Sequence, residues 1–301
     1  MTSAREQGSA PFFVVGAQRS GTTMLRLMLN AHPRLCVPFE SGFIIDFHDR
    51  RDGYGELAVK DNAARLLDEI AAHPKVRKGG LVTDRDAILA RPIRGYADLV
   101  DAIFSVYAEE RGKPRWADKT PWYVTEIDKL WGLFPSARII HLVRDGRDVA
   151  LSLRSLDWGS RHLPRVAADW RWKTTLAHKV GSVVPERFLE VRYEDLVLQT
   201  QPTLERICAF VGEAFDPGML AFHRNAEQEM PQDSVKYHRN SVRSPNKEKV
   251  YAWKERMSSA DRIIFEQIAG AELSLFGYER ENRPSTWMSR IKNVYYCAKR
   301  W

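Results

Sequence analysis

The sequence predicts a three-layer α/β fold, in which helices flank both faces of a central parallel sheet. Short apolar runs at 12–16 and 138–143 have the composition of buried strands, and each breaks into a turn that opens a helix. Further strand-like and helical segments alternate along the rest of the chain. Because ligands of such folds bind beyond the carboxyl ends of the strands, we expect the functional site at the turns after these two runs.

The turn after the first run has the spacing of a phosphate-binding loop. Four residues separate Gly16 from Gly21, and Thr23 stands at the Ser/Thr position of a nucleotide-binding P-loop. Thr22 occupies the place of the P-loop lysine, so this P-loop-like turn is expected to hold a phosphate group without hydrolysing a triphosphate. A strand, a tight loop and a helix start aim a nest of backbone N–H groups at an anion. We expect these groups from Ser20, Gly21, Thr22 and Thr23, with Arg19 as the cation of the loop.

The two turns together resemble a known family. Residues 18–23, QRSGTT, are similar to the 5′-phosphosulfate loop of sulfotransferases, whose donor is 3′-phosphoadenosine 5′-phosphosulfate (PAPS). Residues 138–152 resemble the segment of these enzymes that grips the 3′-phosphate, and the resemblance implies that Arg144 and Ser152 do so here. It implies PAPS as co-substrate and transfer to a hydroxyl or amine. By analogy with phosphoryl transfer we expect an in-line reaction, and a metal-independent one because the sulfuryl group carries less charge than a γ-phosphoryl group. Gln18 departs from the family, in which a proline is common, and this affects the expected stiffness of the loop.

Sulfuryl transfer needs a base for the acceptor proton and positive charge near the leaving oxygen. Glu40 is the one acid in a mainly apolar segment, and burial beside Phe39 and Phe43 is expected to raise its pKa. The alternative is a structural carboxylate held by a neighbouring arginine. The motifs look most like those of tyrosylprotein and related bacterial sulfotransferases. This resemblance implies that Glu40 is the general base, and that Arg19 and Lys119 stabilise the leaving oxygen.

Other candidates lie in the second half of the chain. His141, inside an apolar strand, is expected to be a core histidine. Tyr193 matches a family segment that contacts the nucleotide, although a core tyrosine at the end of a strand is nearly as good an explanation. Residues 230–250 are polar and predict a long loop of the kind that is often functional. Within this loop, 240–250 resembles the basic segment that folds over the nucleotide, with Arg243 as the best-matched cation.

Composition limits the classes of protein to consider. The 301 residues are 44% hydrophobic, enough for one large core, and contain neither a transmembrane-length apolar run nor a secretory signal. Three scattered cysteines predict buried free thiols, a reducing compartment and a cytoplasmic location. Neither a structural metal nor nucleic acid is expected as a partner, because ligand clusters and basic runs interleaved with aromatic residues are absent from the sequence. The net charge of +7 fits a polyanionic donor.

The predicted organisation is a loose leader at 1–10, a catalytic domain at 11–280 and a basic aromatic tail at 281–301. The tail could contact a membrane surface or be a frayed or docked helix. Segments 56–73 and 96–111 have helical apolar spacing and predict an inserted helical layer over the active face. The remaining expected elements are a strand at 187–193 and helices at 22–31, 122–133, 147–154, 164–184, 202–212, 216–228 and 259–274.

Two other functions stay open at this point. A nucleotide kinase or other NTPase would share the loop but lacks its lysine here. A non-catalytic nucleotide-binding protein could keep the fold without turnover. The sequence leaves the oligomeric state open. It does not identify the acceptor either, which could be a carbohydrate, a lipid, peptidyl tyrosine or a small alcohol.

Overall fold

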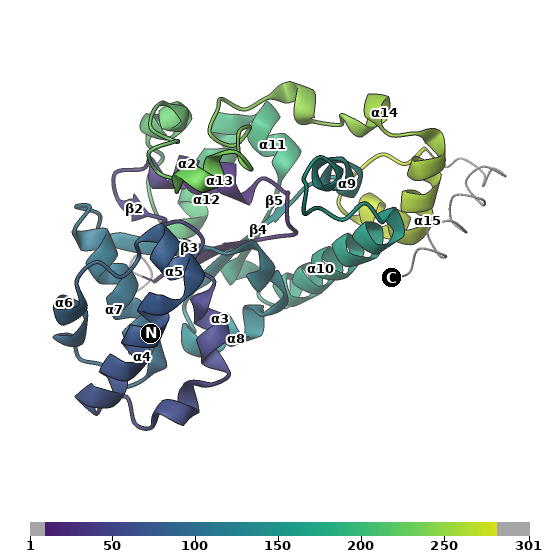
Figure 1. Ribbon diagram of the computed structural model, residues 1–301. Helices are drawn as coiled ribbons and strands as arrows, with labels where there is room; N and C mark the ends of the chain where they lie inside the picture. Colours follow the sequence, from purple (N-terminus) through teal and green to yellow (C-terminus); the bar gives the residue numbers. More distant parts are fainter. Residues whose placement is uncertain (1–9, 282–301) are drawn as a thin grey trace.

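The computed structural model describes residues 10–281, and its centre is a parallel five-stranded sheet of order β2-β3-β1-β4-β5 (Figure 1). The strands are β1 (Phe12–Val15), β2 (Leu35–Cys36), β3 (Arg115–Lys119), β4 (Arg138–Val143) and β5 (Phe188–Arg192). In the middle strand, Phe12 pairs with Ala117 of β3 and with Arg138 of β4. The turns after β1 and β4 therefore leave the sheet side by side, and the predicted fold class is confirmed.

Alternation along β1 separates the two faces of the sheet. Phe13 and Val15 belong to one hydrophobic cluster, whereas Phe12 and Val14 belong to another. All four side chains are fully buried, because successive residues of a strand point to opposite faces and each face is covered by helices.

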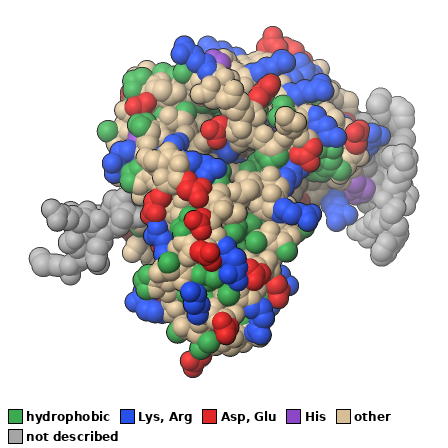
Figure 2. Space-filling model, turned by 60° about the vertical axis from the view of Figure 1, so that its left-hand side comes forward, with side chains coloured by type: hydrophobic (Ala, Val, Ile, Leu, Met, Phe, Trp, Pro, Cys, Tyr) green, Lys and Arg blue, Asp and Glu red, His purple; other side chains and the backbone are tan. Residues whose placement is uncertain are grey.

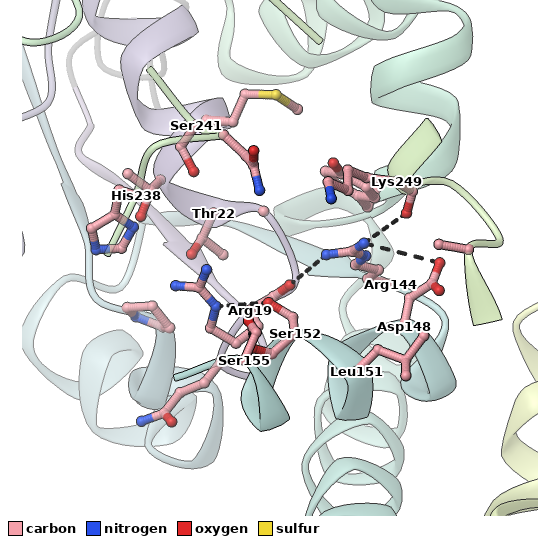
Figure 3. A pocket seen from close by; sticks show the side chains of 18 of the residues that line it. Arg19, Thr22, Arg144, Asp148, Leu151, Ser152, Ser155, His238, Ser241 and Lys249 are labelled. Carbon is pink, nitrogen blue, oxygen red and sulfur yellow. Dashed lines mark hydrogen bonds and ion pairs between the residues drawn. The ribbon is translucent and has the colours of Figure 1, made fainter. Parts of the chain in front are cut away.

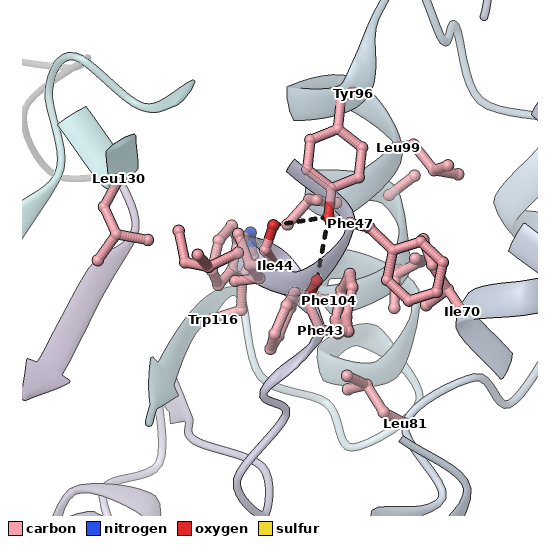
Figure 4. Close-up of a cluster of buried hydrophobic side chains, with 14 of the residues drawn as sticks. Phe43, Ile44, Phe47, Ile70, Leu81, Tyr96, Leu99, Phe104, Trp116 and Leu130 are labelled. Carbon is pink, nitrogen blue, oxygen red and sulfur yellow. Dashed lines mark hydrogen bonds between the residues drawn. The ribbon is translucent and has the colours of Figure 1, made fainter. Parts of the chain in front are cut away.

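The cluster around Phe13 includes most of the segment between β2 and β3. This segment forms α3 (Phe43–His48), η1 (Arg51–Tyr54), α4 (Lys60–Ala72), α5 (Pro74–Gly79), α6 (Arg85–Leu89) and α7 (Tyr96–Glu109). Figure 4 shows its aromatic centre, where the ring of Phe104 stacks on Phe43 at 5.9 Å and on Trp116 of β3 at 4.5 Å. The Tyr96 hydroxyl donates to the Ile44 carbonyl at 2.9 Å, which ties α7 to α3. The 3₁₀ helix η2 (Pro121–Thr125) and α8 (Ile127–Leu133) complete this face.

The inserted helical layer exists, but its predicted place over the active face is wrong. None of the residues 56–111 lines the cavity described below. The apolar sides of α4 and α7 are instead used in the cluster around Phe13, and α7 packs against β3. Burial of these apolar stripes against the sheet decides where the layer lies.

The opposite face carries α2 (Thr22–Asn30), α11 (Tyr193–Leu198), α12 (Thr200–Val211) and η4 (Pro217–Arg224). A third cluster joins α9 (Gly146–Arg154), the long α10 (Leu163–Val183), α14 (Trp253–Arg256) and α15 (Ser259–Leu275). The connecting segments contain the short η3 (Pro185–Arg187), α13 (Gln232–Val235) and η5 (Lys247–Lys249). Residues 230–250 are largely irregular, as predicted, whereas 216–228 forms a 3₁₀ helix and turns.

Three expectations concern the chain outside this core. The leader (1–10) and the basic aromatic tail (281–301) lie outside the described residues, apart from Ala10 and Glu281. Among the described helices, none combines the length and the apolar character that a membrane crossing requires. Cys36 and Cys208 are buried free thiols, as expected.

Candidate functional site

A cavity of about 360 Å³ lies where the turns after β1 and β4 meet. Figure 3 shows Arg19 and His238 on one side of it, and Arg144, Asp148 and Lys249 on the other. The lining residues predicted from the sequence are Arg19, Gly21, Thr22, Thr23, Glu40, Arg144, Ser152 and Tyr193. The other three candidates, Ser20, Lys119 and Arg243, are not among the lining residues.

The turn after β1 combines a tight bend with a helix start. Gly16 packs so closely on β4 that a Cβ atom would lie 2.5 Å from the Leu142 carbonyl oxygen. Arg19 has a positive φ of 69°, and Gly21 precedes α2 with a φ of 95°. The Ser20 N–H donates to the Ala17 carbonyl at 3.2 Å, so it is engaged within the turn. The first-turn N–H groups of α2, starting at Thr22, have no carbonyl one turn earlier in the helix and suit an anion.

Gly21 is required by its backbone and by its neighbour. A Cβ atom at this position would lie 2.4 Å from Cδ2 of Tyr193. We expect Gly21→Ala to displace the Tyr193 ring and to weaken the affinity for adenosine 3′,5′-bisphosphate, measured by calorimetry. Gly112→Ala is the matched control, because Gly112 has a φ of 66° but nothing within 4 Å of its Cβ position. Equal affinities of the two variants would contradict a role of this close approach in ligand binding.

The turn after β4 reaches the first turn through two side chains. Arg144 donates from Nη1 to the Arg19 carbonyl at 3.2 Å and from Nη2 to the Lys249 carbonyl at 2.7 Å. Arg19 donates from Nε to the Ser152 hydroxyl at 3.1 Å. Asp148, whose carboxylate accepts the Trp253 N–H at 2.8 Å, lies 3.9 Å from Arg144. Burial raises the pKa of Asp148 to about 6, although Arg144 opposes the rise.

Tyr193 connects these parts and is more than a strand-end core residue. Its ring is buried, borders Gly21 and lines the cavity, and the Arg144 guanidinium lies 4.4 Å from the ring centroid. Burial is the main reason why the pKa of Tyr193 is raised. Two buried polar atoms here, Ser20 Oγ and Arg144 Nε, have no hydrogen-bond partner within the described chain. Such orphaned donors, beside a cradle that a Cβ would fill, suit a phosphorylated ligand.

Glu40 is held between two lysines. Its Oε2 lies 3.3 Å from Nζ of Lys119, and its Oε1 contacts Nζ of Lys75. Burial raises the pKa of Glu40, but the charges of Lys119 and Lys75 outweigh it, and the net direction is downward. The expected rise in the pKa of Glu40 is therefore wrong, because two cations distant in sequence neutralise the cost of burial.

Lys119 lies at the end of β3 and is fully buried. Burial lowers its pKa, and the charge of Glu40 opposes this. The neighbouring Asp118 is also buried, and burial raises its pKa to about 6. Lys119 reaches the cavity only through Glu40, because its own side chain does not form the lining.

His238 lines the cavity, although it was not among the candidates predicted from the sequence. It is partly buried in the 230–250 segment, and burial, Lys119 and Arg19 lower the pKa of its ring to about 3. The ring is therefore neutral near pH 7. The signal available in the sequence was the polar loop itself, since neither a motif nor a spacing marks this histidine.

The cations that line the cavity late in the chain differ from the one predicted, and one of them, Arg256, lies beyond the 240–250 segment, in α14. Arg243 is exposed and stands apart from the cavity, whereas Lys249 and Arg256 line it. His141 is buried, with Nδ1 3.2 Å from Glu190, as expected of a core histidine. The described residues 10–281 contain no group of three or more His, Cys, Asp or Glu side chains that could hold a metal ion.

On the face presented in Figure 2, basic and acidic side chains are interspersed, so the positive charge does not form one continuous surface there. The cations that converge are those of the cavity, Arg19, Arg144, Lys249 and Arg256. Their arrangement suits a compact polyanion.

Comparisons with known proteins agree with this geometry. A family model described as the sulfotransferase family matches residues 11–217. The nodulation protein NoeE of Sinorhizobium fredii is 25% identical over 293 residues, which cover 89% of this chain and 66% of NoeE. Protein-tyrosine sulfotransferase A of Caenorhabditis elegans is 25% identical over 224 residues, which cover 70% of this chain and 52% of that protein. The chain thus spans about two thirds or less of the length of these two relatives.

Solved structures share the fold. The sulfotransferase domain of the Synechococcus PCC 7002 olefin synthase superposes with a TM-score of 0.63 at 24% identity, covering 90% of this chain and 96% of that domain. The sulfotransferase domain from the curacin biosynthetic pathway gives a TM-score of 0.56 at 22% identity, covering 90% and 99% respectively. With the family model matching more than half of the chain, this protein belongs to the sulfotransferase family.

Proposed function

We propose that this protein transfers the sulfuryl group of PAPS to a hydroxyl or amine of an acceptor. The observation that carries the proposal is the junction of two anion-binding turns, in which Arg19 Nε lies 3.1 Å from Ser152 Oγ. Phosphate-type cradles that are distant in sequence and meet in one cavity suit a nucleotide with phosphate groups at both ends of its ribose. The orphaned buried atoms of Ser20 and Arg144 support this choice.

The donor supplies the transferable sulfuryl group. The residues of the protein bind and orient the donor and the acceptor, and they take up one proton. The N-terminus of α2, Arg19 and the Thr22 and Thr23 hydroxyls would hold the 5′-phosphosulfate, and Arg144 and Ser152 the 3′-phosphate. Tyr193 would lie against the nucleotide. Arg19 would stabilise negative charge on the leaving oxygen, and the same role for Lys119, which does not line the cavity, stays a prediction. Arg243, which lies outside the cavity lining, stays a prediction for the nucleotide contact.

Glu40 is the proposed general base. It lines the cavity and is ionised near neutral pH, because its pKa is below the usual range. An ionised carboxylate can take the acceptor proton directly, onto a carboxylate oxygen, without first losing a proton of its own. The lowered pKa makes Glu40 a weaker base than a carboxylate whose pKa is near 7. Movement of the Lys119 ammonium group from Glu40 toward the leaving oxygen would offset this, because it would weaken the ion pair that lowers the pKa.

The donor site is tested by calorimetry with adenosine 3′,5′-bisphosphate. We expect Arg144→Ala to weaken this binding by about 10- to 100-fold, because charge-assisted hydrogen bonds contribute about 1.5–3 kcal/mol. Binding of adenosine 5′-monophosphate should change much less if Arg144 serves the 3′-phosphate. Arg85→Ala, which removes an exposed arginine paired with Asp68, is the control. Failure of the wild-type protein to bind the bisphosphate, or equal losses for both nucleotides, would overturn this assignment.

The acceptor is tested by incubating labelled PAPS with carbohydrates, lipids, tyrosine peptides and small alcohols. Because the chain covers only part of NoeE and of the nematode enzyme, their printed functions do not select among these classes. Transfer in the presence of a chelator is the matching test of metal independence.

The absence of a nucleic-acid partner, the cytoplasmic location and the membrane contact of the tail (281–301) stay predictions. The kinase alternative is not favoured, because Thr22 replaces the P-loop lysine and the family model is that of sulfotransferases.

A further inference from the structure

Glu40 has a second lysine partner that no motif of the sequence indicates. Lys75 lies in α5, in the helical layer inserted between β2 and β3. Its Nζ donates to Oε1 of Glu40, while Nζ of Lys119 lies 3.3 Å from Oε2. The two carboxylate oxygens are thus held by cations from different parts of the chain, one from the helical layer and one from the sheet.

The path of the Lys75 side chain is built into the backbone. It runs directly over Gly42, where a Cβ atom would lie 2.7 Å from Cδ of Lys75. Gly42 has a φ of 67° and immediately precedes α3. The missing side chain at 42 leaves the space through which the lysine reaches the carboxylate.

Lys75 differs from Lys119 in its surroundings. The Lys75 side chain is 39% exposed, whereas that of Lys119 is 2% exposed. Neither lysine lines the cavity, so both contact Glu40 from outside its lining. Because the Lys75 side chain is partly exposed, its ammonium group keeps part of its hydration while its contact orients one oxygen of Glu40.

We propose that Lys75 is a positioning residue for Glu40: from outside the cavity lining it fixes the orientation of this carboxylate and keeps it ionised. This inference rests on the proposed function of Glu40 for its catalytic consequence. The other charged or titratable groups near Glu40 are Lys119 and Asp118 of β3 and His238 of the 230–250 segment. Lys119 and Asp118 belong to the sheet and His238 lines the cavity, whereas Lys75 does neither.

The test replaces Lys75 with methionine, which keeps the length of the stem and removes the charge. A cation stabilises the carboxylate form, so its loss raises the pKa of Glu40. The acid limb of the kcat profile is expected to move to higher pH in Lys75→Met. Lys75→Arg should return the acid limb toward that of the wild type. Lys60→Met, at an exposed position of the same helical layer, should leave the limb unchanged.

A second readout does not depend on turnover. The carboxyl carbon of Glu40, assigned by comparison with Glu40→Gln, is titrated by NMR in ¹³C-glutamate-labelled protein. The proposal requires a higher titration midpoint in Lys75→Met, and coincident titrations of this variant and the wild type would overturn it. If the midpoint moves while Glu40→Gln keeps full activity, the positioning by Lys75 stands and the proposed base is wrong. Unchanged binding of adenosine 3′,5′-bisphosphate by Lys75→Met checks that the fold is intact.

Discussion

Replacing Glu40 with glutamine is expected to lower kcat by about 10²- to 10⁴-fold, which is the usual contribution of a general base. Glutamine keeps the size of the side chain but cannot take the acceptor proton. The donor turns do not include residue 40, so binding of adenosine 3′,5′-bisphosphate should persist. Initial rates with saturating PAPS, together with calorimetry on the same preparation, measure both quantities.

The control for this prediction is Glu56→Gln, which removes an exposed carboxylate of the inserted segment. A normal rate for Glu40→Gln would exclude Glu40 as the base. His238 is then the next residue to replace, because its ring is neutral near pH 7 and lines the same cavity. Loss of activity in His238→Ala, with full activity in Glu40→Gln, would transfer the role of base to the histidine.

Arg147→Met is expected to lower the free energy of unfolding by about 3–5 kcal/mol, the range for breaking a buried ion pair from one side. The guanidinium of Arg147 is fully buried, at 2.8 Å from Asp145 and 2.7 Å from Glu266. It also lies 3.4 Å from the centroid of the Trp253 ring. Its removal leaves two buried carboxylates without their cation. Urea denaturation at neutral pH measures the loss.

Neutralising the stranded acids separates charge from packing. The triple variant Arg147→Met, Asp145→Asn, Glu266→Gln should recover a large part of the lost stability, because it no longer buries unpaired charge. Arg85→Met, which breaks an exposed pair with Asp68, should change the denaturation midpoint only slightly. If Arg147→Met alone were as stable as the wild type, the buried ion-pair network would contribute nothing to the free energy of unfolding.

The regular elements could be predicted where local patterns dominate. β1 with α2, and β4 with α9, combine an apolar run, a turn and a helix start within some twenty residues, and both pairs were predicted within about one residue of their bounds. The 3₁₀ helix η4 was expected as an α-helix, and α11 was missed. α11 is only six residues long and follows β5 directly, so it carries little periodic signal.

The site was predictable at the turns and less so around the base. Arg19, Arg144 and Ser152 belong to motifs, and the structure brings them together. The environment of Glu40 was misjudged, because its apolar sequence neighbours suggested burial without charge, whereas its partners come from 35 and 79 residues further along the chain. The same limit applies to the 240–250 segment, where Arg243 was the expected nucleotide cation but Lys249 lines the cavity, since an irregular segment has no period that fixes which side chains point inward.

The parallel pairing of β2 with β3 has a consequence for how this scaffold can diversify. Leu35 and Cys36 lie opposite Arg115 and Trp116, so the chain departs from one strand and returns on its immediate neighbour. A connecting segment whose two ends lie on neighbouring strands can be lengthened, shortened or exchanged while the register of the sheet is kept. The nucleotide cradle would survive such grafting. Because Glu40 also lies between these two strands, any transplanted segment would have to supply a carboxylate at its place as well as a cation at the place of Lys75.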